Sequence, residues 1–380
     1  MSPRVPVLEL VVSTQPGGGP QHVLDLATAL RARGWRPIVG GPRDGALFDR
    51  FAAASIETVA LRTDRLRPAT LLRLVRLIRR RGIGLVHSHG KGAGLYGRLA
   101  ARLLRVPAVH TFHGIHFERY GAGARATYLG MERRLARWTR VIVNVSRAQE
   151  AEGLALRLFT PAQSRVVLNG VDAARLNAAA LDPFDARKAL ELETEMAVVG
   201  CAARFDEVKH LDLLLRAVAL PAARGATLVL IGRGPEERPL RALAETLGVA
   251  GRVRFAGEIA DAARLFRAFD VYAAPSRKEG MPLAVLEAMA LGLPVVASDI
   301  PAHRELLGPA SDGVVAATPE TFATALGALV ADDQARALLG AENRTRARSE
   351  FGAREMVSAI EAIYREVGGP DMAPHTPQRS

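Results

Sequence analysis

The sequence holds a single cysteine, Cys201, among 380 residues. An internal disulfide is therefore excluded, which is typical of a protein in a reducing compartment. Long apolar runs are also missing, because Glu9 interrupts residues 5–12, and Glu287 and two prolines interrupt residues 281–297. Neither run predicts a membrane-spanning helix, and the first lacks the layout of a signal peptide. We therefore expect a cytoplasmic protein.

Acidic side chains are scarce in the first half of the chain. Residues 1–180 hold 28 Lys and Arg but 11 Asp and Glu, whereas the remainder holds 23 and 28. This positive charge indicates an anionic partner: a nucleic acid, a phosphorylated ligand or an anionic membrane surface. Aromatic residues make up only 5% of the chain, and we find no recognisable nucleic-acid-binding module, so we expect no nucleic-acid partner.

Short apolar segments alternate with helical patterns in both halves of the chain. This alternation predicts an α/β protein built from two Rossmann-like, doubly wound parallel-sheet domains. We place the first domain at residues 1–180 and the second at residues 181–350. A last helix at residues 351–367 is expected to pack back on the first domain, and residues 368–380 are expected to form a disordered tail.

A glycine-rich loop at residues 17–19 follows the first expected strand and precedes a helical pattern. Glycine lets the backbone come close to a ligand, so a strand, glycine loop and helix in this order can approach a phosphate. The spacing is not G-x-G-x-x-G, and no lysine follows as it does in a P-loop. The loop alone is therefore weak evidence for a nucleotide site.

Polar side chains stand at the ends of the next expected strands, where the ligand crevice of an open α/β sheet lies. They are His87, His89, His110, His113 and Ser146. Clustered histidines can bind zinc, but none has a helical i, i+4 partner, and the sequence offers no cysteine or close carboxylate to complete a set. We therefore expect polar contacts to a substrate and no metal.

Eight arginines lie at positions 62–81, interleaved with leucine, valine and isoleucine. From Pro68 onward the pattern predicts a basic amphipathic helix, which can lie on anionic lipid headgroups. An ordinary surface helix, with its apolar stripe on the sheet and its charges in solvent, fits the same pattern. Both interpretations stay open at this point.

The most specific pattern is at residues 276–290, after an expected buried strand at 271–274. The chain crosses a turn at Glu279 and Gly280 and enters a short helix that carries Glu287. Two carboxylates beside the free N–H groups of a helix N-terminus suit a phosphorylated, hydroxyl-rich ligand. The segment by itself also fits an ordinary loop and helix whose acids are solvated.

This segment reads S-x-x-E-G-x-P-x-x-x-x-E-A-M-A-x-G-x-P-V-V-A, with Glu279 and Glu287 as an E-x7-E pair. Together with the other motifs it resembles the retaining GT-B glycosyltransferases of glycosyltransferase family 4. The supporting motifs are Gly18-Gly19 with His22, the run at 87–101, His110-Thr111-Phe112-His113-Gly114, Asn169-Gly170-Val171-Asp172, and the pair Arg204 and Lys209. The resemblance extends over residues 5–367.

The resemblance implies roles for the matching positions, of which His113, Arg204, Lys209 and Glu279 form the catalytic set. Arg204 and Lys209 grip the donor diphosphate and stabilise the charge that develops as it leaves. Glu279 holds the transferred sugar, Glu287 holds the nucleotide ribose, and His113 lies near the acceptor. Further donor-side positions are Gly18, Gly19, Gly234, Gly257, Glu258, Gly280, Met281, Pro282 and Leu283. The acceptor-side positions are His22, His89, Lys91, His113 and Asn169.

Two positions depart from the family pattern. The glycine that usually follows the lysine is His210, and the G-G-x-x-E segment after the last strand is replaced at residues 300–305, where Glu305 keeps the acid. These departures bear on the substrate and not on the fold.

The resemblance implies transfer from a UDP- or GDP-sugar with retained anomeric configuration, the leaving phosphate deprotonating the acceptor hydroxyl. No D-x-D pair occurs in the chain, which fits a metal-independent reaction without cofactor, in which cationic side chains replace a divalent ion. The two GT-B domains are expected to face a central cleft and to close over it, which excludes water.

We expect transfer of a hexose or N-acetylhexosamine to a lipid-linked acceptor, in cell-envelope polysaccharide or glycolipid synthesis. The site of action would be the cytoplasmic face of the inner membrane, with residues 62–81 as a peripheral contact. A small soluble acceptor is the nearest alternative. A nucleotide-sugar epimerase has no reason to keep the E-x7-E pair, and a non-catalytic binding subunit would have lost Arg204, Lys209 or Glu279.

Overall fold

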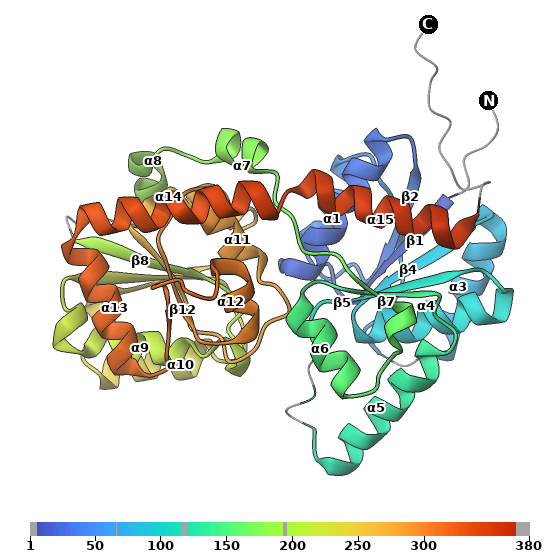
Figure 1. Ribbon diagram of the computed structural model, residues 1–380, viewed down its shortest axis with the longest axis horizontal. Coiled ribbons are helices and arrows are strands. Elements are labelled where there is room, and N and C mark those ends of the chain that lie inside the picture. Colours follow the sequence, from blue (N-terminus) through green and yellow to red (C-terminus); the bar gives the residue numbers. More distant parts are fainter. Residues whose placement is uncertain (1–5, 66, 116, 118–119, 193–195, 370–380) are drawn as a thin grey trace, which may run out of the picture. The chain divides into compact units, whose positions relative to one another are not determined.

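The computed structural model describes residues 6–65, 67–115, 117, 120–192 and 196–369. The chain forms two compact units, Met1–Asn169 with Arg354–Ser380, and Gly170–Ala353. Each unit is a parallel sheet covered by helices (Figure 1), which confirms the predicted fold class. The units separate at residue 170, earlier than the boundary at 180 expected from the sequence. Of the tail expected at 368–380, residues 370–380 lie outside the described part.

The first unit contains a seven-stranded parallel sheet with the order β3-β2-β1-β4-β5-β6-β7. Its strands are β1 (Pro6–Val11), β2 (Arg36–Gly41), β3 (Glu57–Ala60), β4 (Leu85–His89), β5 (Ala108–Phe112), β6 (Val141–Asn144) and β7 (Ser164–Val166). Its helices are α1 (Gly18–Ala32), α2 (Leu47–Ala53), α3 (Pro68–Arg81), α4 (Lys91–Leu104), α5 (Ala122–Ala136), α6 (Arg147–Ala155) and α15 (Ala353–Gly368). Strand order reverses between β1 and β4, so their carboxyl ends form the crevice where such sheets bind ligands.

Strand β1 is buried on both faces, which requires helices on each side of the sheet. Leu8 and Leu10 pack with residues of α3 and α4 on one face. Val7 packs on the other face with α1 and with α15, the red helix that crosses this sheet in Figure 1. The last helix, Ala353–Gly368, therefore supplies part of the first unit's core.

The second unit contains a six-stranded parallel sheet with the order β10-β9-β8-β11-β12-β13. Its strands are β8 (Ala197–Ala202), β9 (Ala226–Ile231), β10 (Val253–Gly257), β11 (Val271–Ala274), β12 (Val295–Ser298) and β13 (Val314–Val315). Its α-helices are α7 (Ala173–Ala179), α8 (Pro183–Ala189), α9 (Leu211–Ala219), α10 (Glu237–Thr246), α11 (Leu283–Ala290), α12 (Pro301–Leu307), α13 (Pro319–Ala331) and α14 (Asp333–Glu350). Order reverses here between β8 and β11, and the ligand crevice is expected at their carboxyl ends.

Helix α3 spans the residues predicted from Pro68, and its buried side chains are Thr70, Leu74 and Ile78. Leu74 and Ile78 belong to the core of the first unit. The apolar stripe therefore packs on the sheet, as in the surface-helix interpretation. Within the described residues, no helix combines the length and the apolar character needed to cross a membrane.

The backbone at His210 is of the kind that suits the glycine implied by the resemblance at this position. His210 links a short 3-10 turn at Glu207–Lys209 to α9, with φ 52° and ψ 39°. This left-handed conformation costs an L-residue with a side chain about 1–2 kcal/mol, and glycine adopts it freely. His210 therefore adopts a conformation that is unfavourable for a residue with a side chain.

We predict that His210→Gly is more stable than His210→Ala by about 1 kcal/mol, because both remove the imidazole and only Ala keeps a Cβ in the left-handed region. Urea unfolding of the two variants measures the difference. The same two replacements at the exposed helical position Arg216 should show the opposite order of stability, with the Ala variant more stable by about 1 kcal/mol. Equal stability of the two His210 variants would contradict the left-handed backbone conformation at this position.

Candidate functional site

The first unit brings histidines together at the carboxyl ends of β1, β4 and β5. We call His22, His87, His89 and His113 the histidine cluster. The ring centroids of His87 and His89 lie 4.1 Å apart, those of His89 and His113 5.2 Å, and those of His22 and His113 5.0 Å. The predicted acceptor-side residues His22, His89 and His113 therefore lie side by side.

A carboxylate that the sequence analysis did not assign to the site holds this cluster. Glu9 of β1 has no solvent exposure, and its Oε2 lies 2.9 Å from His89 Nε2 and 3.3 Å from His87 Nδ1. The Tyr364 hydroxyl on α15 donates to Glu9 Oε1 over 2.5 Å. Both oxygens of the buried carboxylate are thus hydrogen-bonded, as burial of a charge requires.

Burial and charge together set the protonation of this region. Burial alone would raise the pKa of Glu9, but the neighbouring His87 and His89 outweigh it and hold the pKa well below its ordinary value. Burial, with a contribution from His87, lowers the pKa of His89 to about 4. Burial also lowers the pKa of His22 to about 3 and that of His113 well below its usual range. Near neutral pH, Glu9 is ionised and these three imidazoles are neutral.

Two further contacts complete the cluster. His22 Nδ1 lies 3.1 Å from Asn169 Oδ1, so another predicted acceptor-side residue joins the group. His113 Nε2 lies 3.0 Å from His89 Nδ1. A Cβ on Gly19 would lie 3.5 Å from His113 Cδ2, so the glycine loop runs directly beside the ring of His113.

The cluster also contains atoms with the chemistry of a metal site. One nitrogen each of His22, His89 and His113 lies within 4.8 Å of the others, and Glu9, His87 and His89 form a second such group. The expectation of no zinc site rested on the lack of a close carboxylate in the sequence, and this premise is wrong, because Glu9 lies beside His87 and His89. Imidazole nitrogens backed by a carboxylate are suitable ligands for a divalent transition metal.

Lys91 lies apart from these hydrogen bonds at the start of α4. Its Nζ stands 4.6 Å from the ring centroid of Tyr120 and 4.4 Å from that of Tyr128. It also donates to the Tyr120 hydroxyl over 3.3 Å. Cation–π contacts with these two tyrosine rings therefore help to hold Lys91 in place.

The second unit places the predicted catalytic Glu279 in a partly buried ion pair. Lys209 Nζ lies 2.6 Å from Glu279 Oε1, and the Ser276 hydroxyl donates to the same oxygen over 2.6 Å. Lys209 follows β8 and Glu279 follows β11, so the pair stands where strand order reverses. Burial alone would raise the pKa of Glu279, but Lys209 and the bond from Ser276 outweigh it and lower the pKa.

Arg204, the other predicted diphosphate ligand, stands in the same loop and pairs with Asp206. Its side chain keeps 66% of its exposure, whereas that of Lys209 keeps 24%. The loop therefore presents one accessible guanidinium and one half-buried ammonium. Together they can bind an anion with two or more oxygens.

The remaining predicted donor-side positions lie around this loop. Gly280, Met281 and Leu283 are buried, and Pro282 caps α11, which carries Glu287. Gly234 packs so closely that a Cβ would lie 2.3 Å from the Phe205 carbonyl oxygen. Gly257 has φ 73° and accepts a bond from Gly232, and Glu258 is exposed. Gly18 begins α1 in the other unit.

His303 is a residue of this region to which the sequence analysis gave no role. It is buried on α12, its Nδ1 lies 2.8 Å from the Ser298 carbonyl oxygen, and its Nε2 is buried without a partner among the described residues. Burial lowers the pKa of His303, and the neighbouring charge of Glu279 partly opposes this shift by raising the pKa. Its position in the altered segment at 300–305 gave no signal of this burial.

Comparisons with known proteins agree on one family. The model described as "Glycosyltransferase Family 4" matches residues 16–175, and the model "Glycosyl transferases group 1" matches residues 197–332. A D-inositol 3-phosphate glycosyltransferase of Saccharomonospora viridis is 33% identical over 74% of this chain and 70% of its own length. The UDP-Gal:alpha-D-GlcNAc-diphosphoundecaprenol alpha-1,3-galactosyltransferase of Escherichia coli is 27% identical over 85% of this chain and 86% of its own.

Solved structures show the same architecture. Anabaena HepE, in complex with UDP and glucose, superposes with a TM-score of 0.84 at 23% identity. The match covers 95% of this chain and 100% of that one. At this identity the likeness establishes the shared two-sheet fold.

We predict that Lys209→Met destabilises the protein by about 1–3 kcal/mol at pH 7, because it leaves Glu279 buried without its cation. The pKa of Glu279 is lowered on folding, so the pair stabilises fully above the unfolded pKa, and the contribution disappears as pH falls through the folded pKa. Urea unfolding should therefore show a difference that shrinks below about pH 4.5. Arg241→Met, which breaks the exposed pair with Glu237, is the control and should cost under about 1 kcal/mol. A pH-independent difference would contradict the prediction.

Proposed function

The chain belongs to glycosyltransferase family 4 and is a glycosyltransferase, and we propose that it transfers a hexose or N-acetylhexosamine from a nucleoside-diphosphate sugar to an acceptor hydroxyl with retained configuration. The observation that carries this proposal is the ion pair of Lys209 with Glu279 beside the exposed Arg204. It places two cations and one carboxylate at the switch point of a nucleotide-binding type of sheet.

Each group of this loop suits one part of such a donor. Arg204 and Lys209 bind diphosphate oxygens and stabilise the charge that grows as the sugar bond breaks. Glu279, kept ionised by Lys209, accepts hydrogen bonds from hydroxyls of the sugar. Glu287 on α11 accepts from the ribose. With the cations supplied by side chains, we propose that the donor phosphates need no metal ion.

The names of the related proteins support a nucleotide donor. HepE binds UDP and glucose, and the Escherichia coli relative is named for UDP-Gal. We propose a UDP-sugar as the first donor to examine and a GDP-sugar as the second. The leaving phosphate takes the proton of the acceptor hydroxyl, since the cluster histidines are weak bases.

The acceptor is proposed to bind at the histidine cluster of the first unit. The name of the Escherichia coli relative contains a diphosphoundecaprenol acceptor, which supports a lipid-linked substrate at the cytoplasmic membrane face. The Saccharomonospora viridis relative is named for D-inositol 3-phosphate, so a small phosphorylated polyol is the second candidate. Positive charge on the first unit suits either one.

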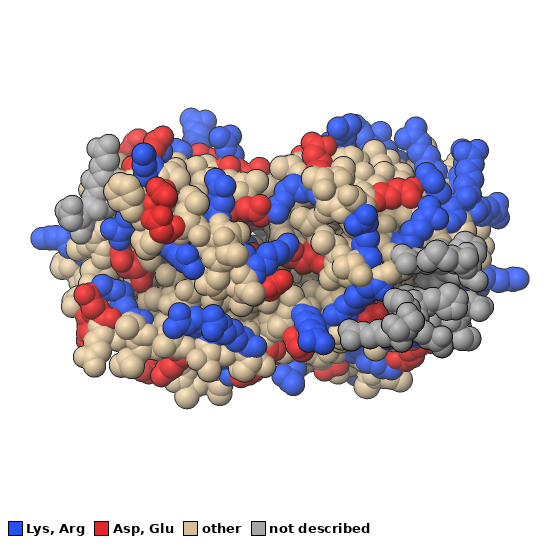
Figure 2. All heavy atoms as spheres, turned by 90° about the horizontal axis from the view of Figure 1, so that it is seen from above, with Lys and Arg blue, Asp and Glu red and all other residues tan. Residues whose placement is uncertain are grey.

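The surface of the first unit carries side chains that suit a contact with the membrane. Arg73, Arg76 and Arg80 of α3 are exposed, and Leu72 on the same helix is 57% exposed. The face of the first unit visible in Figure 2 carries many basic side chains with a few acidic ones among them. Because the stripe of α3 packs on the sheet, we propose an electrostatic contact with anionic headgroups and not insertion of the helix.

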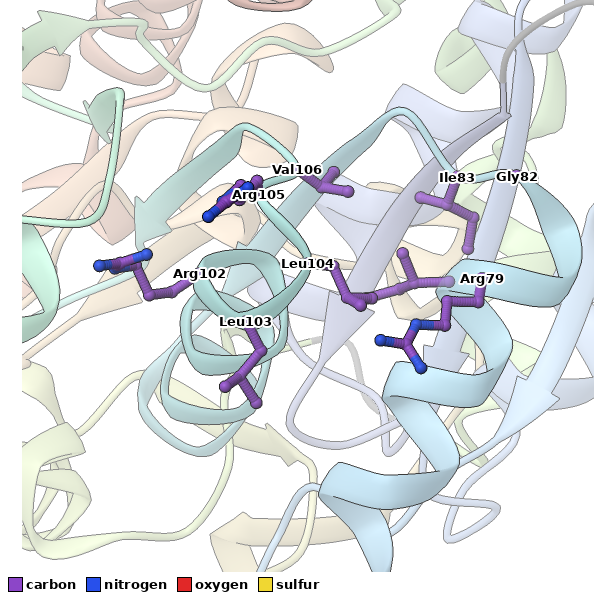
Figure 3. Close-up of a pocket in the computed structure, with 9 residues that line it drawn as sticks. Arg79, Gly82, Ile83, Arg102, Leu103, Leu104, Arg105 and Val106 are labelled. Atoms are coloured by element: carbon purple, nitrogen blue, oxygen red, sulfur yellow. The ribbon is translucent and has the colours of Figure 1, made fainter.

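A hollow of about 830 Å³ adjoins this surface between the C-terminal ends of α3 and α4. Ile83 and Leu104 face each other across it, and the guanidinium groups of Arg102 and Arg105 point away (Figure 3). Leu103 at its rim is 64% exposed. Mixed basic and apolar side chains of this kind suit a lipid surface.

We predict that Arg204→Ala with Lys209→Ala lowers the transfer rate by at least about 10³-fold, because both cations at the diphosphate are lost. Product formation from UDP- and GDP-sugars measures the loss. The control is Arg224→Ala with Arg348→Ala, two exposed arginines of the same unit, which should transfer at the rate of the unaltered protein. Near-normal turnover of the first double variant would rule out the diphosphate assignment.

We also predict that replacing Arg73, Arg76 and Arg80 by Gln weakens binding to phosphatidylglycerol vesicles by roughly 10²-fold, at about 1 kcal/mol per arginine. Flotation at low and high salt measures it, because screening weakens such contacts. The variant with Arg224, Arg344 and Arg348 replaced by Gln is the matched control. If the unaltered protein does not float at low salt, the membrane contact is wrong and the soluble acceptor is favoured.

A further inference from the structure

The hydrogen bonds from β1 to His113 determine where the protons lie. Glu9 is ionised and can only accept, so His89 donates from Nε2 across the 2.9 Å contact. A neutral imidazole carries one N–H, and the Nδ1 of His89 is therefore a lone pair. It lies 3.0 Å from His113 Nε2, which must carry the proton of His113. The Nδ1 of His113 is consequently bare.

The same reasoning applies to His22. The amide oxygen of Asn169 can only accept, so His22 donates from Nδ1 across 3.1 Å. Its Nε2 is then a lone pair, and this atom is buried without a partner among the described residues. A buried acceptor without a donor calls for an explanation, and a bound ligand is one. The centroids of His22 and His113 are 5.0 Å apart, so the two unprotonated nitrogens belong to neighbouring rings.

We propose that this cluster is a hydrogen-bond acceptor site for a substrate hydroxyl, and that Glu9 and Tyr364 are positioning residues which hold His113 with its Nδ1 free to accept. The inference rests on the proposed function and adds residues to it. The two positioning residues act through His89 and touch neither the reacting atoms nor the substrate.

Tyr364 orients the carboxylate on which the proton arrangement depends. Its hydroxyl donates to Glu9 Oε1 and lies 2.5 Å from His87 Nδ1, from which it can accept. His87 Nε2 in turn lies 2.7 Å from the Thr111 hydroxyl. Rotation of Glu9 would break these bonds, so Oε2 stays directed at His89.

The arrangement selects one chemical class of ligand. Two lone pairs repel a phosphate, carboxylate or carbonyl oxygen and attract a hydroxyl, which can donate. Because burial holds the pKa of His113 well below its usual range, the ring is a poor base and orients the hydroxyl without removing its proton. The anionic groups of donor and acceptor are therefore expected to bind elsewhere.

Nitrogen-15 NMR of histidine-labelled protein tests the proton positions directly, with each of the four cluster signals assigned by single replacement. We expect His89 and His113 protonated at Nε2, and His22 protonated at Nδ1. A proton on Nδ1 of His113 would overturn the inference. The measurement uses the unaltered chain, so it stands even if a Glu9 variant does not fold.

Kinetics test the positioning role. In Glu9→Gln the single amide oxygen cannot accept from both Tyr364 and His89, and we expect kcat to fall about 10²-fold with the donor KM unchanged. Tyr364→Phe should lower kcat about 5-fold, the effect of one hydrogen bond. Because Tyr364 acts through Glu9, the double variant should be no slower than Glu9→Gln. Additive losses, or a rise in donor KM instead of the fall in kcat, would contradict the role.

Glu361→Gln is the matched control for these variants. Glu361 is a carboxylate on α15 that accepts from Trp35 Nε1 over 2.8 Å, outside the histidine cluster. Its variant should keep kcat and all histidine signals. Loss of kcat in this control equal to that of Glu9→Gln would mean that the helix contact alone matters, which would overturn the inference.

A zinc titration tests the alternative that the same lone pairs bind a metal ion. Zn²⁺ alone should bind weakly, because His113 Nε2 is protonated and directed at His89. One tightly bound Zn²⁺ that raises the transfer rate would overturn the inference in favour of a metal site. Failure of the proposed function has a different signature: an unaltered protein that transfers no sugar from any donor.

Discussion

The first unit depends on a carboxylate that has no access to water. Glu9 lies in the central strand β1 among Val7 and Val11, where an unpaired charge would cost several kcal/mol. Partners from two other elements therefore meet it: His87 and His89 of β4 lie beside one carboxylate oxygen, and Tyr364 of α15 donates to the other. The need to hydrogen-bond the Glu9 carboxylate thus constrains three features together. They are the register of β1 with β4, the position of α15 and the orientation of the histidine rings.

The second unit also contains a carboxylate with little solvent exposure, and a cation neutralises its charge. Glu279 is paired with Lys209, so this carboxylate is neutralised by a cation, whereas Glu9 accepts from the Tyr364 hydroxyl and from His89, whose pKa burial lowers to about 4. The two kinds of environment respond differently to a ligand. An ion pair next to an exposed arginine can rearrange around an incoming anion, but a saturated hydrogen-bond network keeps its geometry. A leaving group that gains charge needs the first arrangement, and a hydroxyl that must be aimed needs the second.

Much of this architecture could be predicted from the sequence because parallel strands are apolar and short, and glycine marks their ends. The E-x7-E segment correctly placed Glu279 in the loop and Glu287 on the helix. Glu9 was read only as an interruption of an apolar run, since nothing local indicates that Tyr364 lies beside it. The same limit applied to His303, whose burial depends on how α12 packs. Contacts between residues hundreds of positions apart leave no periodic signal.

The position of α15 has a consequence for how the chain folds during synthesis. The first unit is discontinuous, since part of its core and one partner of Glu9 come from the segment that begins at Arg354, whereas Gly170–Ala353 is continuous. A ribosome releases the second unit's strands and helices before it reaches Tyr364. The unit begun first is therefore the one finished last, and its buried carboxylate lacks the hydrogen bond from Tyr364 until the final helix emerges. Such an intermediate exposes an incomplete apolar sheet face and is a natural substrate for a chaperone.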